Sequence, residues 1–168
     1  ILVCAGAGGH AGTLSPFALV REVREFFDGP LALSGSISEG SSVLSALALG
    51  ADFAYVGTKF IATEEANASP GYKQMIIDST ADDIMYSATF TGVNGNYLRA
   101  SVEAAGLNPD EHMSGSKDDM NFSTSAIAKK DNSSKAWKDI WGSGQGIGSI
   151  KNAPSVEDAV NQMVSEYD

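Results

Sequence analysis

Cysteine is nearly absent from this chain of 168 residues, because Cys4 is its single thiol. One cysteine excludes an intramolecular disulfide, and it also excludes a zinc site built from several thiolates. The scarcity suits a reducing compartment, and we expect a cytoplasmic protein. Cys4 lies in a short apolar segment, so we interpret it as a packing residue rather than a reactive thiol.

Positive charge is scarce as well. Lys and Arg together number 11, whereas Asp and Glu number 21, so the formal net charge is -10. A protein that binds nucleic acid or an anionic membrane surface needs a basic face to neutralise phosphate groups. The charge balance therefore argues against both partners, and we interpret the acidic excess as serving solubility.

Long hydrophobic runs are also missing. No segment reaches the ~20 consecutive apolar residues of a membrane helix, and no signal-peptide pattern opens the chain. The hydrophobic share is 43% and the charged share is 19%, which is typical of one globular domain with enough apolar material for a core. The first residue is Ile1 rather than Met, and we expect the chain to be a piece of a longer protein.

Three rounds of strand, loop and helix occupy the first part of the chain. Apolar segments at 1–5, 31–37 and 52–56 predict buried strands, and helices are predicted over 16–28 and 41–49. This alternation predicts parallel strands joined by right-handed crossovers. A closed eight-stranded barrel takes about 250 residues, so we expect further strands upstream.

The sequence changes beyond Phe60, where polar residues become frequent. A helix is predicted over 64–79, with an interruption at Pro70-Gly71. Residues 81–86 are predicted either to start a helix or to run extended. The remaining predictions are loops over 92–97 and 108–119 and short helices over 101–105 and 122–130.

The clearest helix is the last one. It is predicted to begin at Pro154-Ser155, with Asp158 at the third position of a capping box. Its apolar residues form one stripe that we interpret as structural: Val156, Ala159, Val160, Met163, Val164 and Tyr167. We divide the chain into βα units at 1–62, a helical and loop insertion at 63–134, and a glycine loop with the C-terminal helix at 135–168.

Small, hydrogen-bonding residues follow each of the three predicted strands, as Gly8-Gly9, Ser34-Gly35-Ser36 and Gly57-Thr58. The carboxyl ends of parallel strands meet at one edge of a sheet, where ligands bind. Backbone N–H groups of such loops can hold a phosphate without a lysine. Tight turns explain each loop taken alone, but the three together predict a phosphorylated cofactor.

His10 follows the first of these loops. Its imidazole titrates near neutral pH and can act as an acid, as a base or as a hydrogen-bond donor to a developing negative charge. A lone histidine is more often structural, but the position beside two glycines at a strand end favours a catalytic role.

Two other groups of residues are interpreted as structural. The acidic cluster around His112 lacks the spacing of a calcium loop and has no second histidine at metal-ligand spacing, so we predict no metal site. Trp137 and Trp141 are one helical turn apart and are typical of core or lid packing. A lid over a flat ligand remains the alternative.

Four segments in this order resemble the nitronate monooxygenases, formerly called 2-nitropropane dioxygenases. They are Ala7-Gly8-Gly9-His10-Ala11-Gly12, the helix that begins at Ser15-Pro16, residues 48–66, and Trp141-Gly142-Ser143-Gly144-Gln145-Gly146-Ile147-Gly148. The similarity runs over nearly the whole of this chain, which corresponds to about the C-terminal half of the proteins in that family.

The resemblance implies an α/β fold that is part of a TIM (β/α)8 barrel, with a mostly helical added segment and an FMN cofactor. It implies a catalytic role for His10. The positions that match the cofactor-binding residues of the family are Gly8, Ser34, Gly35, Ser36, Gly57, Thr58, Gly144 and Gln145. Two departures are Ser36, where many relatives have glycine, and Lys59, where arginine is common.

The activity that the resemblance implies is oxidation of a nitronate by dioxygen, with FMN as electron acceptor and with a carbonyl compound and nitrite as products. His10 would stabilise or deprotonate the substrate, and whether neutral nitroalkanes also react stays open. Flavin-dependent enoyl-acyl carrier protein reductases share the fold and the Gly-Gly-His turn but consume NAD(P)H, so this activity is one alternative. An inactive half-barrel that cannot hold flavin is another.

Overall fold

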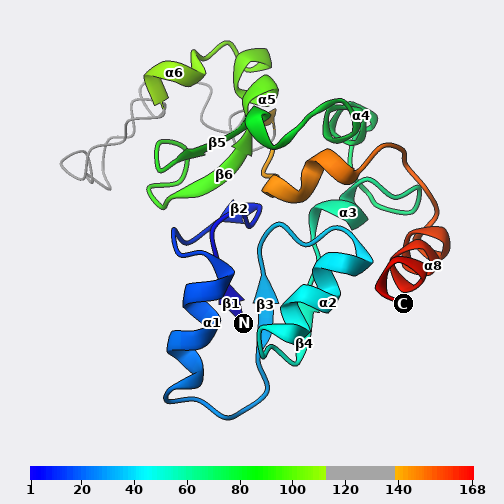
Figure 1. The fold of residues 1–168 in the computed structure, drawn as a ribbon. Coiled ribbons are helices and arrows are strands. Elements are labelled where there is room, and N and C mark those ends of the chain that lie inside the picture. The colour runs from blue at the N-terminus through cyan, green and yellow to red at the C-terminus, as the bar shows by residue number, and fades with distance from the viewer. Residues whose placement is uncertain (113–138) are drawn as a thin grey trace.

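The computed structural model describes residues 1–112 and 139–168. Its first sheet holds three parallel strands in the order β1-β3-β4, which are β1 (Leu2–Val3), β3 (Ala32–Ser34) and β4 (Phe53–Tyr55). Leu33 of the central strand pairs with Leu2 on one side and with Ala54 on the other. The predicted alternation of parallel strands and helices is therefore present at the start of the chain (Figure 1).

Helices α1 (Pro16–Arg24) and α2 (Gly40–Ala48) connect these strands. Ser15 accepts a hydrogen bond from the Ala18 N–H, and Pro16 occupies the first turn, as expected for a helix start. The helix ends at Arg24, earlier than predicted. The Arg24 guanidinium donates to the carbonyl oxygens of Phe27 and Gly29, which holds the following residues in a turn.

Cys4 packs in the core between this sheet and its helices. Its side chain is fully buried, and Sγ donates to the Ser34 carbonyl oxygen at 3.0 Å. Burial raises the pKa of the Cys4 thiol, so the thiolate that would be needed for reactivity is disfavoured. The buried members of the cluster are Cys4, Val20, Leu31, Leu33, Ile37, Ala46 and Ala51, and the packing interpretation is confirmed.

A second, antiparallel sheet was not predicted. Its order is β2-β6-β5, formed by β2 (Gly9–His10), β6 (Gly95–Leu98) and β5 (Ile84–Ser87). The loop prediction over 92–97 is wrong at its C-terminal end, because the central strand β6 is buried and paired on both sides. Residues 81–86 follow the extended alternative after a single turn of 3-10 helix, η1 (Ala81–Asp83). The added segment is thus not only helix and loop.

Four helices lie between β4 and residue 112: α3 (Thr58–Ile61), α4 (Pro70–Asp78), α5 (Arg99–Ala104) and α6 (Pro109–His112). Pro70 does not interrupt a helix but begins one. Ser69 caps α4 by accepting from the Tyr72 N–H, and proline is favoured in a first turn because its missing N–H is not needed there. α6 falls where a loop was predicted, and the predictions over 122–130 and at Trp137 lie outside the described residues.

The C-terminal part holds η4 (Gln145–Ser149) and α8 (Val156–Tyr167). The predicted start of α8 is confirmed, since Ser155 accepts from the Asp158 N–H. α8 packs beside α2 (Figure 1). The apolar stripe is only partly buried: Ala159 is inaccessible, whereas Val156, Val160, Val164 and Tyr167 are 37–56% exposed. None of the described helices is long and apolar enough to cross a membrane.

Candidate functional site

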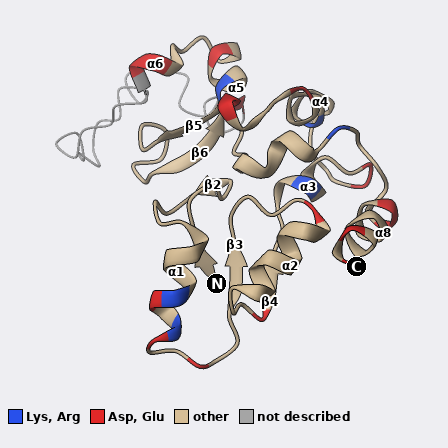
Figure 2. Ribbon diagram, viewed as in Figure 1, with Lys and Arg blue, Asp and Glu red and all other residues tan. Residues whose placement is uncertain are grey.

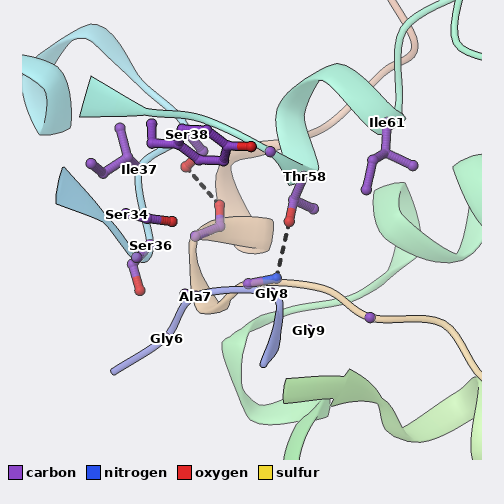
Figure 3. Close-up of a pocket in the computed structure, with 16 residues that line it drawn as sticks. Gly6, Ala7, Gly8, Gly9, Ser34, Ser36, Ile37, Ser38, Thr58 and Ile61 are labelled. Carbon is purple, nitrogen blue, oxygen red and sulfur yellow. Dashed lines mark hydrogen bonds between the residues drawn. The ribbon is translucent and has the colours of Figure 1, made fainter. Parts of the chain in front are cut away.

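The loops that follow β1, β3 and β4 surround one cavity of about 280 Å³ together with the glycine segment ahead of η4 (Figure 3). Seven of the eight residues predicted to bind cofactor line it, namely Gly8, Ser34, Gly35, Ser36, Gly57, Thr58 and Gly144. The convergence follows from topology, because neighbouring parallel strands end at the same edge of their sheet. The eighth residue, Gln145, is not part of the lining.

The loop after β3 requires an unusual backbone. Gly35 has φ +140°, and a Cβ there would lie 2.2 Å from Cys4 Sγ, so only glycine fits. Ser36 follows with φ +56° and is the one non-glycine residue with positive φ in the described chain. This backbone is natural for glycine and costs other residues free energy. The structure thus gives a physical reason why the family resemblance implies glycine at this position.

Hydrogen bonds fasten the glycine segment to the strand-end loops. The Gly144 N–H donates to Thr58 Oγ1 at 3.0 Å, and Ser38 Oγ donates to the Gly146 carbonyl oxygen at 2.8 Å (Figure 3). The Gln145 N–H donates to the Gly6 carbonyl oxygen at 2.9 Å. Gln145 therefore holds the glycine segment against the loop after β1 through its backbone, without lining the cavity, and the residue is exposed.

The lining offers hydroxyl groups but carries no formal charge. Its side-chain donors are hydroxyl groups, on Ser34, Ser36, Ser38, Tyr55 and Thr58, and no Lys, Arg, His, Asp or Glu belongs to it. Figure 2 shows basic and acidic residues on α1 and acidic residues on α8, neither of which lines the cavity. Hydroxyl and backbone N–H groups can hold an anion without a cation, and no carboxylate in the lining repels one.

His10 lies next to the cavity but does not line it. Its neighbour Gly9 is part of the lining, and His10 Nε2 lies 3.1 Å from Thr91 Oγ1 at the protein surface. The Thr91 hydroxyl gives its single hydrogen to the Val93 carbonyl oxygen at 2.9 Å. When the Thr91 hydrogen is on the Val93 carbonyl oxygen, a neutral His10 donates to Thr91 through Nε2 and its Nδ1 is unprotonated.

Sequence reasoning missed part of the lining. Gly142 and Gly146 belong to the late glycine segment, and their glycine-rich surroundings were the available signal. Ser38 and Ile61 lie just beyond the predicted loop residues, and nothing in the sequence around them indicated that they line the cavity. Thr91 could not have been found, because its contact with His10 joins residues 81 positions apart.

Comparisons with known proteins identify the family of the chain. The family model of nitronate monooxygenases matches residues 1–166. The putative monooxygenase Rv1533 of Mycobacterium tuberculosis is 28% identical over 169 residues, which cover 96% of this chain and 45% of that protein. A nitronate monooxygenase of Paraburkholderia phytofirmans is 31% identical over 112 residues, which cover 61% of this chain and 31% of that protein. The chain spans less than half the length of these relatives.

Solved structures show the same fold. FabK from Thermotoga maritima matches with a TM-score of 0.71 and 24% identity, over 98% of this chain and 52% of that one. A nitroalkane oxidase from Streptomyces ansochromogenes matches with a TM-score of 0.69 and 23% identity, over 98% of this chain and 50% of that one. Because the family model spans nearly every residue, the chain belongs to the nitronate monooxygenase family.

Proposed function

We propose that the protein is an FMN-dependent oxidoreductase that oxidises nitronates with dioxygen to a carbonyl compound and nitrite. The observation that carries the proposal is the convergence of three strand-end loops and the glycine segment on one uncharged, donor-rich cavity beside His10. In this proposal the three βα units belong to a TIM barrel, residues 63–134 are an added segment, and residues 135–168 return to the barrel.

The cavity fits the phosphate end of FMN. Gly57 lines it, and a Cβ built there meets no protein atom within 4 Å, so the space in front of this glycine is open. Its volume is near the lower limit of ligand pockets, about 300 Å³, which suits a phosphate with part of the ribityl chain. The Ser36 and Thr58 hydroxyls and the loop backbone would hold the phosphate. A bound flavin supplies the electron acceptor for the nitronate.

His10 would accept a proton from the substrate or stabilise its negative charge. In the neutral tautomer that donates to Thr91 through Nε2, Nδ1 can accept a proton from a neutral nitroalkane. In the protonated form, the same ring stabilises the nitronate anion by a charge-assisted hydrogen bond. The bond to Thr91 limits rotation of the ring in both forms.

A matched pair of glycine variants tests the cavity. Gly57 has φ -115°, which suits any residue, so Gly57→Leu should fold while its side chain fills the proposed phosphate space. Gly148 also has open space in front of it but does not line the cavity, so Gly148→Leu is the control. We expect flavin fluorescence titration to show FMN binding for wild type and Gly148→Leu and its loss for Gly57→Leu.

Equal FMN affinity in the two variants would contradict the assignment of the cavity. A wild-type protein that stays colourless with added FMN would instead favour the inactive half-barrel. Enoyl reduction is supported by fold likeness alone, for example to the enoyl reductase domain of MlnA from Bacillus amyloliquefaciens at a TM-score of 0.59. Anaerobic mixing of the oxidised holoenzyme with NADH or with a nitronate separates these activities, because only the true donor bleaches the flavin.

A further inference from the structure

The hairpin formed by β5 and β6 holds the backbone of His10. His10 of β2 pairs with Gly95 of β6 (Figure 1), and the carbonyl oxygen of the next residue, Ala11, accepts a hydrogen bond from the Tyr86 hydroxyl of β5 at 2.9 Å. A Cβ at position 95 would lie 2.7 Å from the Gly9 carbonyl oxygen, so glycine is needed there for the two strands to meet. The place of the His10 backbone is therefore set by the hairpin.

The loop between β5 and β6 also contacts the His10 ring. Within the described residues, Thr91 of this loop is the one side chain that hydrogen-bonds the ring, with Oγ1 at 3.1 Å from Nε2. Thr91 Oγ1 is itself fixed by the Val93 backbone, because it donates to the carbonyl oxygen at 2.9 Å and accepts from the N–H at 3.2 Å. The Tyr97 hydroxyl, on a residue that is 6% exposed, lies 3.4 Å from the same oxygen. Thr91 is thus a fixed partner for the ring.

The hydrogen-bonding capacity of Thr91 leaves one place for His10. A threonine hydroxyl has one hydrogen to donate and two lone pairs to accept with. When the hydrogen is on the Val93 carbonyl oxygen, one lone pair takes the Val93 N–H and the other faces His10 and Tyr97, of which His10 is nearer. His10 is exposed, so packing restricts its ring little. Because the imidazole is rigid, a bond that holds Nε2 also sets the direction of Nδ1.

We propose that Thr91 is a positioning residue, which holds the His10 imidazole with Nδ1 available to the substrate, and that the β5–β6 hairpin is the support for this arrangement. The inference rests on the proposed function, in which His10 is the catalytic residue. Thr91 does not line the cavity, so it acts through His10 rather than by touching the substrate.

The test compares three variants of the holoenzyme. Thr91→Val keeps the shape of the side chain but cannot accept a hydrogen bond, whereas Thr91→Ser keeps the hydroxyl. Thr89→Val is the matched control, because the Thr89 hydroxyl in the same loop accepts from Ser87. We expect Thr91→Val to lower kcat with a nitronate about 10–100-fold, the scale of a misplaced catalytic group, with KM and FMN affinity unchanged. Thr91→Ser and Thr89→Val should keep most of the wild-type kcat.

A double-mutant cycle shows whether Thr91 acts through His10. Added to His10→Asn, the Thr91→Val change should alter the residual kcat by no more than about twofold, the usual error of such a cycle. An equal loss in both backgrounds, or an equal loss in Thr89→Val, would overturn the inference, because the loop would then support the fold rather than the ring. Wild-type kcat in Thr91→Val would overturn it as well.

The motion of the ring can be measured without any substrate. Carbon-13 relaxation reports the picosecond-to-nanosecond motion of each imidazole, and His112→Gln assigns the signals because the chain has two histidines. We expect an ordered His10 ring in wild type and Thr91→Ser and a mobile ring in Thr91→Val. If wild type oxidises no nitronate, the proposed function fails, and these spectra decide whether Thr91 holds the ring. A wild-type ring as mobile as in the urea-unfolded protein would overturn the inference without any variant.

Discussion

Gly40, the first residue of α2, allows the C-terminal helix to dock. A Cβ built on Gly40 would lie 2.0 Å from the Met163 carbonyl oxygen and 2.4 Å from the Tyr167 nitrogen. Both are backbone atoms of α8, so no side-chain rotation relieves the clash. Glu166 Oε2 also accepts a hydrogen bond from the Gly40 N–H at 2.9 Å. We therefore predict that Gly40→Ala forces α8 away from α2.

Two effects of Gly40→Ala oppose each other, and their magnitudes decide the sign. Helix propensity alone favours alanine over glycine by about 1 kcal/mol. Overpacking typically costs about 1–3 kcal/mol, and loss of a hydrogen bond to a charged group costs about 1.5–3 kcal/mol. The net expectation is a loss of about 1.5–5 kcal/mol in the free energy of unfolding. For a chain of this size each kcal/mol lowers Tm by about 2–4 °C.

Circular dichroism during thermal and urea unfolding measures this loss. The control is Ser41→Ala, at the next position of α2, where the side chain is exposed and a change within about 0.5 kcal/mol is expected. A Gly40→Ala variant as stable as wild type, or more stable, would refute the contact between α2 and α8. A loss of similar size in Ser41→Ala would show that the first turn of α2, rather than α8, is the sensitive element.

His10→Asn should leave flavin bound and lower turnover ~100-fold or more in steady-state assays with a nitronate, as expected for loss of a positioned acid-base group. Near-normal turnover would exclude a catalytic role for His10. Ser36→Val should lower the free energy of unfolding in urea by about 1–3 kcal/mol, because a β-branched residue fits poorly at φ +56°. Ser36→Gly should stay within about 1 kcal/mol of wild type. Equal stability of the two variants would show that the backbone at this position is not strained. Hydrogen bonds from the Leu31 N–H and the Arg24 guanidinium lower the pKa of Asp52. The Asp52 carboxylate therefore stabilises the fold at pH values above the ordinary pKa of an aspartate. This stabilisation is lost as the pH falls through the lowered pKa. Asp52→Asn should reduce the loss of stability over this pH range, as measured by circular dichroism during acid unfolding. An unchanged acid unfolding curve would show that Asp52 does not stabilise the fold through its carboxylate.

The three parallel strands could be predicted because each is a continuous apolar segment followed by small residues. The run 31–37 contains β3, whose Leu33 is buried. The strand predicted at 52–56 is present as β4, but it is not a buried strand, because Phe53 and Tyr55 are 60% and 55% exposed. The loop residues of the site could be predicted for the same reason, since glycine and serine mark the point where each strand ends. Topology then placed seven of the eight predicted cofactor residues around one cavity.

The second sheet could not be predicted from local sequence. β2 has two residues, and β6 reads as a polar turn because its glycine and asparagine are typical of loops. Asn96 is nevertheless 2% exposed, since its side-chain amide donates to the Ala7 carbonyl oxygen at 2.7 Å. The hydrogen-bond partner of the Asn96 amide is distant in the sequence, so the pattern of polar and apolar residues around Asn96 could not predict that it is buried. The contact between His10 and Thr91 depends on the same sheet and was missed for the same reason.

The last helix contributes to the site without touching it. Lys59 Nζ donates to Gln162 Oε1 at 3.2 Å, Gln162 Nε2 donates to Glu166 Oε1 at 2.7 Å, and the other oxygen of Glu166 accepts from Gly40. α8 thereby joins α3 and α2, the helices that follow two of the loops around the cavity. Gln162 and Glu166 do not line the cavity, so α8 supports the helices that follow its loops from outside.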